Sequence, residues 1–212
     1  MPPIGPCRFC ADWPDGLTSV TSAVWLGEEA REIVHHLKYE GYTRIAELAA
    51  RTIAKYVTDP PPEATIVPIP LGIRRRYERG YNQAAEIAKA LGAIWACRID
   101  EGVIRRKRET RSQTALDPDE RIRNVHGVFS AVLATGGPCK QHDESGFSRA
   151  WRGQAETVES HSSVAILIDD VLTTGATLAS AAEALLDAGW GEVRAVTFAR
   201  ALPFVVRLDT PE

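Results

Sequence analysis

The sequence predicts an α/β fold with a doubly wound, mostly parallel sheet flanked by helices. Short β-branched and aliphatic runs, at about 64–69, 164–168 and 192–199, alternate with longer segments in which apolar residues recur every three or four positions. The run at 164–168 is continuously apolar, which is typical of a parallel strand buried on both faces. Alternating strands and helices favour parallel strands joined by helical crossovers.

Composition excludes several other classes of protein. The chain has 212 residues, of which 44% are hydrophobic and 25% charged, so it is expected to be globular rather than disordered or fibrous. Its net charge of -3 argues against a protein built mainly to coat nucleic acid. Without a recognisable signal peptide or a membrane-spanning run, we expect a cytoplasmic protein with no membrane partner. Four cysteines in this length do not indicate a disulfide scaffold.

In the first half of the chain, the pattern predicts an N-terminal loop and then alternating elements. Residues 1–27 are rich in Pro, Gly, Thr and Ser and are expected to form that loop. Helices are expected at about 28–39 and 43–57, and a strand at 64–69. A loop through Gly80 should lead to a helix at about 82–91 that ends at Gly92, followed by a weaker strand at 93–99.

The second half contains two polar stretches between its elements. Residues 105–123 predict a mobile basic loop leading into a short helix, and a strand lies within 125–133. Residues 134–163 have too few apolar residues to bury a face and are expected to form a poorly ordered insertion. The strand at 164–168 precedes a helix at about 176–188, with Gly189 as its stop, and a last strand at 192–199. We therefore expect one domain over 28–212.

Basic residues are concentrated in the middle of the chain. Between Arg74 and Arg123 there are 13 Lys and Arg against 8 Asp and Glu. The main clusters are Arg74–Arg76 with Arg79, and Arg105–Arg108 with Arg111. They indicate a site for a phosphorylated metabolite or a nucleic-acid backbone, or else a solvated surface. We find no aromatic residues alternating with these arginines, as a platform for single-stranded nucleic acid would require.

The most informative segment runs from Ala165 to Leu178, where a buried strand ends in two acids and a loop rich in hydroxyls precedes a helix. Amides at a helix N-terminus favour an anion, and ligands of open α/β sheets bind beyond the carboxyl ends of the strands. The acids suit sugar hydroxyls, which donate to carboxylates. Asp169 and Asp170 beside the loop of Thr173, Thr174, Gly175 and Thr177 therefore indicate a phosphoribosyl site. The alternative is that Asp170 or Thr174 merely caps the helix.

This segment closely resembles the phosphoribosyl pyrophosphate (PRPP) motif of type I phosphoribosyltransferases. Other residues look like the ComF family, the competence-associated phosphoribosyltransferase-domain proteins of bacteria. They are Val67-Pro68-Ile69-Pro70, Arg79-Gly80-Tyr81-Asn82-Gln83, Gln113, Arg121, Asn124-Val125, Gly127, Phe129 and Cys7-Arg8-Phe9-Cys10. The resemblance covers about 30–130 and 164–200 and implies a type I phosphoribosyltransferase-like fold.

The resemblance also implies roles for individual residues. Asp169, Asp170 and Arg79 would be the catalytic residues. PRPP would be bound by the run Asp169, Asp170, Val171, Leu172, Thr173, Thr174, Gly175, Ala176 and Thr177, together with Arg75 and Arg76. Mg²⁺ would be held mainly by PRPP oxygens and water, without protein ligands of its own. A nitrogen-containing acceptor would displace pyrophosphate, and the 105–123 loop would close over the site. We also expect a homodimer.

The sequence departs from the related patterns at two places. Thr173 stands where some 6-oxopurine transferases carry an acid, and threonine cannot serve as that acid or base. ComF proteins often carry a zinc module with two cysteine pairs, whereas only Cys7 and Cys10 form a pair here. Structural zinc takes four ligands, and the adjacent His35 and His36 would point in different directions. A degenerate remnant without zinc is therefore the favoured interpretation of residues 1–27.

Three functions remain open at this stage. The first is a phosphoribosyltransferase linked to nucleotide metabolism or DNA uptake. The second is a non-catalytic regulator that senses PRPP or a nucleotide, which needs the same phosphate loop. The third is a competence factor that binds single-stranded DNA through the basic clusters.

Overall fold

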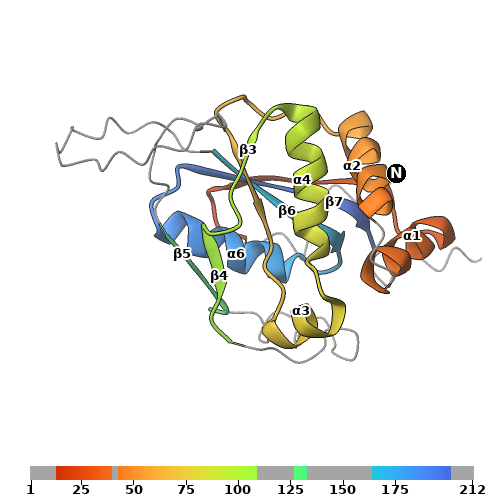
Figure 1. Ribbon diagram of the computed structural model, residues 1–212. Coiled ribbons are helices and arrows are strands. Elements are labelled where there is room, and N and C mark those ends of the chain that lie inside the picture. Colours follow the sequence, from red (N-terminus) through yellow and green to blue (C-terminus); the bar gives the residue numbers. More distant parts are fainter. Residues whose placement is uncertain (1–12, 40–42, 109–126, 133–163, 202–212) are drawn as a thin grey trace, which may run out of the picture.

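A five-stranded sheet in the order β1-β7-β6-β2-β3 forms the centre of the computed structural model (Figure 1). Every neighbouring pair in it is parallel. Its strands are β1 (Leu17–Trp25), β2 (Thr65–Pro68), β3 (Arg98–Ile99), β6 (Val164–Leu172) and β7 (Glu192–Arg200). A separate antiparallel pair joins β4 (Ile104–Arg106) to β5 (Phe129–Ala131). The structure describes residues 13–39, 43–108, 127–132 and 164–201.

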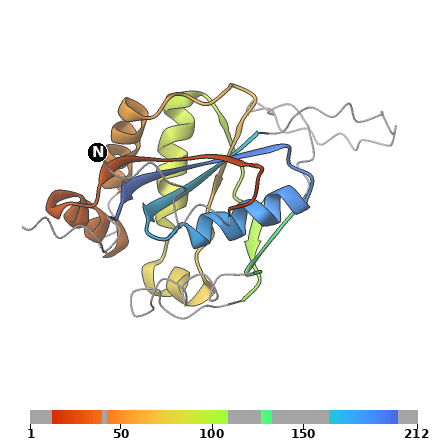
Figure 2. The same cartoon turned by 180° about the vertical axis from the view of Figure 1, so that it is seen from behind.

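Helices cover both faces of the sheet, so the predicted α/β class with a mostly parallel sheet is confirmed. On one face, α2 (Thr43–Tyr56) and α4 (Gln83–Trp95) pack against each other and against the strands. The opposite face carries α6 (Ala176–Asp187), as Figures 1 and 2 show from the two sides. Two further helices, α1 (Glu28–Tyr39) and α3 (Ile73–Arg79), lie toward the end of the sheet where the strands finish.

The central strands divide their side chains between two hydrophobic cores. Because side chains alternate along a strand, Ile66 and Ile166 pack on the α2 and α4 side, whereas Val67 and Leu167 pack on the α6 side. All four are fully buried. A strand buried on both faces must be apolar on both faces, which explains the uninterrupted run at 164–168.

The chain leaves the two central strands in opposite directions. From β2 it passes through α4 to β3 at one edge, and from β6 it passes through α6 to β7 on the other side. Since β2 and β6 are neighbours, the crossover helices diverge beyond their carboxyl ends. Open α/β sheets bind ligands at such a switch point. The strands that carry the quoted sequence motifs, β2 and β6, are the two neighbours at this point.

The predicted N-terminal loop is wrong for residues 17–25, which form β1. This strand pairs in parallel with β7 and lies at an edge of the described sheet. Its sequence, Leu-Thr-Ser-Val-Thr-Ser-Ala-Val-Trp, has few large apolar residues because an edge strand is only partly covered. Thr and Val suit a half-buried pleated surface, so the polar composition conceals a strand. The domain therefore begins before residue 28.

Boundaries differ at three other places. Helix α4 continues past Gly92 to Trp95. Gly92 does not end the helix but lets it approach β3, since a Cβ at position 92 would lie 2.5 Å from Ile99 Cδ1. The expected loop before Gly80 contains α3. Strand β6 runs through both acids to Leu172 instead of ending at Ile168.

Several predictions fall wholly or partly outside the described residues. Only the beginning of the predicted basic loop at 105–123 is described, and its first two residues belong to β4 rather than to a loop. The insertion at 134–163 and the pair Cys7 and Cys10 lie outside the described part of the chain. Among the helices of that part, none is long and apolar enough to cross a membrane.

The join between β1 and β7 can be tested through one cross-strand pair. The hydroxyl oxygens of Ser22 and Thr197 are 2.7 Å apart, and the fully buried Thr197 also donates to the carbonyl of Ala199. Thr197→Val should lower the free energy of unfolding by about 1–2 kcal/mol, since it leaves these partners unsatisfied. With Ser22→Ala added, denaturant unfolding should show a coupling of about 0.5–1 kcal/mol. Strictly additive costs would contradict the pairing.

Candidate ligand-binding site

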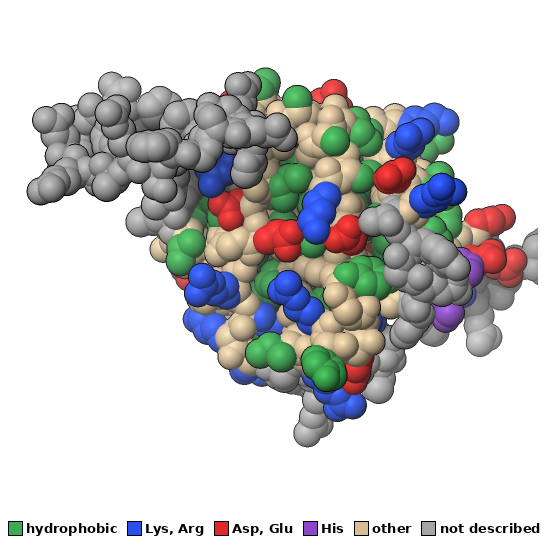
Figure 3. All heavy atoms as spheres, viewed as in Figure 1, with side chains coloured by type: hydrophobic (Ala, Val, Ile, Leu, Met, Phe, Trp, Pro, Cys, Tyr) green, Lys and Arg blue, Asp and Glu red, His purple; other side chains and the backbone are tan. Residues whose placement is uncertain are grey.

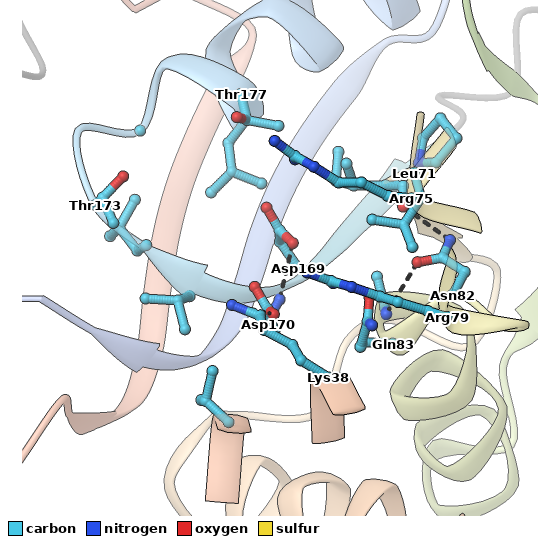
Figure 4. Close-up of a pocket in the computed structure, with 18 of the residues that line it drawn as sticks. Lys38, Leu71, Arg75, Arg79, Asn82, Gln83, Asp169, Asp170, Thr173 and Thr177 are labelled. Atoms are coloured by element: carbon cyan, nitrogen blue, oxygen red, sulfur yellow. Dashed lines mark hydrogen bonds and ion pairs between the residues drawn. The ribbon is translucent and has the colours of Figure 1, made fainter. Parts of the chain in front are cut away.

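A cavity of about 430 Å³ opens beyond the carboxyl ends of β2 and β6 (Figure 4). Its floor is formed by the residues that end these strands, and its walls come from α1, α3, β4 and the start of α4. The lining carries two carboxylates against several cations: Asp169 and Asp170 facing Arg31, Lys38, Arg75, Arg79 and Arg106. A cavity with this charge pattern suits a ligand that bears both anionic groups and hydrogen-bond donors.

The two acids lie in the last part of β6. The Asp169 carboxylate accepts a hydrogen bond from the backbone amide of Asp170 at 2.9 Å. The Asp170 carboxylate pairs with Lys38, whose Nζ lies 2.9 Å from Oδ2. These contacts fix the positions of both acids, and both line the cavity.

The carboxyl group of Asp169 is unusually easy to protonate. Burial, followed by the charge of Asp170, raises its pKa from 3.8 to about 7. The amide of Asp170 and the charges of Lys38 and Arg106 oppose this shift. The folded protein therefore holds a proton that the unfolded chain releases between about pH 4 and pH 7, and the free energy of unfolding falls as the pH rises through this window.

The loop after β6 presents amides and hydroxyls to the same cavity. Thr173, Gly175 and Thr177 line it, whereas Thr174 and Ala176 are buried in the loop and at the helix start. The Thr174 hydroxyl accepts from the amide of Ala176 at 3.4 Å. The first amides of the twelve-residue α6 have no acceptor within the helix, so this end of the helix favours an anion.

Two structural features explain why residue 175 is a glycine. Its φ of +80° is in the left-handed region, where side chains are strained. A Cβ at this position would also lie 2.5 Å from the indole of Trp13. Trp13 comes from the segment before β1 and packs against the α6 core. The space that a Cβ of residue 175 would fill is therefore occupied by the side chain of Trp13.

The arginines of α3 do not all reach the cavity. Arg75 and Arg79 are one helical turn apart, so they share a face and line the cavity, extending toward β6 in Figure 4. Arg76 lies on another side of α3, is exposed and does not line the cavity. Arg106, expected in a mobile loop, instead lies in β4, where its guanidinium donates to the carbonyl of Pro70 at 3.4 Å.

The start of α4 forms the wall next to α3. Asn82 caps this helix by accepting from the amide of Ala84 at 3.2 Å, and its side chain also donates to the carbonyl of Ile69 at 2.9 Å. Asn82 thus joins the helix to the end of β2. The neighbouring Gln83 is 2% exposed, and its Nε2 has no hydrogen-bond partner among the described residues.

Sequence reasoning did not assign Arg31, Lys38 or Gln83 to the site. Gln83 belongs to the run 79–83 that carries part of the family resemblance, so the sequence did contain a signal for its place in the site. For Lys38 the pattern showed only a cation in the last turn of a helix, which the helix dipole alone explains. Its partner Asp170 lies 132 residues away, and only the folded chain brings them together.

The described residues offer no protein metal centre. They contain no group of three or more His, Cys, Asp and Glu side chains that could hold a metal ion. Cys97 is buried between α4 and β3 as a free thiol, and burial raises its pKa. Cys7, Cys10 and Cys139 lie outside the described ranges, so zinc binding by the N-terminal segment stays a prediction.

The fold and the cavity define an α/β protein with a ligand site at a topological switch point. No family model matches the chain. The DNA utilization protein YhgH of Salmonella typhi is 28% identical over 203 residues, which cover 93% of this chain and 78% of that protein. YhgH of Escherichia coli strain K12 is 26% identical over the same shares. Competence protein F of Haemophilus influenzae is 29% identical over 140 residues, or 66% of this chain and 51% of its own length.

These relatives match the family to which the sequence motifs point. At 26–29% identity, these relatives support the resemblance of the chain to the ComF family. The names of its relatives connect the family with DNA utilization and competence.

Gly175→Ala should be more costly than the same change at Gly80. Both glycines have a backbone conformation in the left-handed region, but a Cβ at position 80 would meet no atom within 4 Å. Gly80→Ala should cost about 1–2 kcal/mol of unfolding free energy for its backbone alone. Gly175→Ala should cost a further 1–3 kcal/mol, roughly, because Trp13 must move.

Chemical denaturation of both variants, with and without Trp13→Ala, measures this difference. In the Trp13→Ala background the two glycine substitutions should have similar costs. An excess at Gly175 that persists there would show that Trp13 does not cover the loop.

Proposed function

We propose that this protein binds PRPP and transfers its phosphoribosyl group to a nitrogen-containing acceptor, with pyrophosphate as the leaving group. The observation that carries this proposal is the arrangement at the end of β6, where two carboxylates stand beside the N-terminus of α6 in one cavity. The carboxylates would accept from the ribose hydroxyls, and the helix amides would bind the 5′-phosphate. The quoted PRPP motif and the type I phosphoribosyltransferase-like arrangement support the same interpretation.

The cations opposite the acids suit the pyrophosphate. Arg75 and Arg79 line the wall nearest the end of β2, where charge would develop on the leaving group. Mg²⁺ prefers phosphate oxygens and water to an all-protein cage, and the described residues lack such a cage. PRPP oxygens would therefore supply most of the ligands of Mg²⁺. When bound, the ion would neutralise negative charge on the pyrophosphate.

The transfer itself requires one bond to form and one to break. The acceptor nitrogen bonds to ribose C1 while the bond from C1 to the pyrophosphate oxygen breaks, and the electron pair leaves with pyrophosphate. Gln83 is placed to contribute, since a buried amide without a partner is costly and a ligand oxygen in the cavity would satisfy it. Thr173 lines the cavity but cannot assist an acceptor as an acid or base.

Two measurements distinguish the transferase from a regulator that only senses PRPP. Titration calorimetry with PRPP and Mg²⁺ measures binding, which both functions require. Pyrophosphate release with a panel of nitrogen acceptors measures turnover, which only the transferase shows. Absence of PRPP binding would refute the proposal, and binding without release on any acceptor would favour the sensor.

Replacing Asp169 and Asp170 together with Asn should weaken PRPP binding by about 10- to 100-fold, because each acid loses a charged hydrogen bond to the ribose. Asp169→Asn alone should also raise Tm at pH 8, since it removes a carboxylate whose ionisation burial disfavours. For a chain of this size, each kcal/mol corresponds to about 2–4 °C. Calorimetry and thermal unfolding measure the two effects.

The exposed Asp59, in the loop after α2, provides the matched control. Asp59→Asn should change neither PRPP affinity nor its pH dependence. Unchanged affinity in the Asp169 and Asp170 double variant would contradict their assignment to the ribose.

A second candidate function, binding of single-stranded DNA, is favoured by the surface of α3. The expected absence of an aromatic residue among the clustered arginines is wrong for α3, because Tyr77 follows Arg76 and is 92% exposed. Ile73, one turn earlier on the same side, is 80% exposed. Figure 3 shows hydrophobic and basic side chains together at the lower edge of this face, over α3. An aromatic ring among arginines can stack a base while the cations bind the backbone.

Tyr77→Ala should weaken binding of single-stranded DNA by about 1–3 kcal/mol if a base stacks on this ring. Fluorescence anisotropy at several salt concentrations measures the affinity, and the salt slope should change little because the ring is uncharged. Tyr56→Ala is the control, since Tyr56 is also exposed beside a cation, Lys55, but lies on α2. Equal affinities for the two variants would exclude α3 as the site.

A further inference from the structure

Lys38 reaches the acid pair from a helix that is distant in sequence. It lies in the last turn of α1, and its Nζ is 2.9 Å from Oδ2 of Asp170 (Figure 4). The two side chains are 26% and 14% exposed. Both side chains are therefore partly buried. Salt screens a partly buried ion pair less than an exposed one.

The end of α1 is anchored by the residues that precede this lysine. Leu37 is 1% exposed in the core beneath α2 and α4. Its carbonyl also accepts a hydrogen bond from the Tyr81 hydroxyl, which belongs to the segment between α3 and α4. Val34, one turn earlier, lines the cavity together with Lys38. The ammonium group is therefore held in place by its helix and is not at the end of a loose surface chain.

Charges surround the acid pair from three elements besides β6. They are Arg31 and Lys38 on α1, Arg75 and Arg79 on α3, and Arg106 on β4. Of these, Lys38 makes an ion pair with Asp170. Lys38 and Arg106 also lower the pKa of Asp169, against burial and Asp170, which raise it.

We propose that Lys38 is a positioning residue of the site: its ammonium group orients the Asp170 carboxylate and keeps the acid pair able to accept the ribose hydroxyls at neutral pH. This inference rests on the proposed function, because the hydroxyls belong to the ligand. An ionised carboxylate only accepts hydrogen bonds, whereas a protonated carboxyl carries one O–H donor and has fewer acceptor sites for the ribose hydroxyls. Without the lysine, a buried pair of acids would retain a proton to higher pH.

A lysine that contacts the ligand directly would behave differently. Loss of a direct contact to phosphate would weaken binding by a similar factor at every pH. Loss of a positioning charge would weaken binding mainly at lower pH, where Asp169 retains its proton, and much less at higher pH, where Asp169 ionises without help.

The experiment compares wild type, Lys38→Met, Lys38→Gln and Lys38→Arg by calorimetry with PRPP and Mg²⁺ between about pH 6 and pH 9. Titration of the phosphate itself is common to all variants, so it cancels in the ratio of each affinity to wild type. We expect Lys38→Met and Lys38→Gln to bind about tenfold more weakly than wild type near pH 6.5, and nearly as well near pH 9. Lys38→Arg should restore most of the affinity.

Lys55→Met is the matched control, because Lys55 lies in the last turn of the neighbouring helix α2 with its ammonium 5.0 Å from the ring of Tyr56. It should equal wild type throughout. Circular dichroism confirms folding of each variant. A loss in Lys38→Met that is equal at all pH values, or no loss at all, would overturn the inference.

A readout without ligand separates this inference from the proposed function. Carbon NMR of the Asp169 carboxyl follows its titration in the ligand-free protein. Its midpoint should rise in Lys38→Met and return toward wild type in Lys38→Arg. If wild type fails to bind PRPP while this shift is observed, the proposed function fails and the positioning of the acids by Lys38 stands. An unchanged midpoint would overturn the role of Lys38 whatever the ligand.

Discussion

Two carboxylates at the end of a strand that is buried on both faces are the constraint on which the rest of the site depends. Strand β6 must be apolar along its first half because helices cover both faces of the sheet there. Asp169 and Asp170 come directly after this apolar stretch, where the ladder continues but the cover ends. Burial makes the charge of Asp169 costly, and cations from neighbouring elements oppose this cost.

That compensation defines the shape and the charge of the cavity. Lys38 from α1 and Arg106 from β4 oppose the burial of Asp169, and Lys38 also pairs with Asp170. The start of α4 is tied to the end of β2 through Asn82, and Arg75 and Arg79 of α3 line the same cavity. A site built in this way costs stability above about pH 7, where Asp169 must ionise; under the proposed function, the ionised carboxylate would accept from ligand hydroxyls.

The central elements could be predicted from the sequence because their signals are local. The apolar run before Asp169, the loop ending at Gly175 and the helical spacing after it lie within fourteen consecutive residues. Strand β1 was missed because an edge strand needs few apolar residues, and α3 was missed because none of its residues is buried. Its helical geometry decides that Arg75 faces the cavity and Arg76 does not.

Contacts between distant segments could not be predicted. Lys38 meets Asp170, and Trp13 covers Gly175, only because the sheet order brings the first part of the chain beside β6 and α6. No periodicity or spacing records such a contact. The sequence therefore placed Asp169, Asp170 and the loop after β6 in the candidate site, but it did not predict the contacts that Lys38 and Trp13 make with them.

The most direct test of the central claim is a crystal structure of the protein with ribose 5-phosphate. The phosphate oxygens should lie against the backbone amides of Thr174–Thr177 at the start of α6, with the ribose hydroxyls within hydrogen-bond distance of Asp169 and Asp170. A phosphate bound only at Arg105–Arg108, with the loop after β6 empty, would contradict the account.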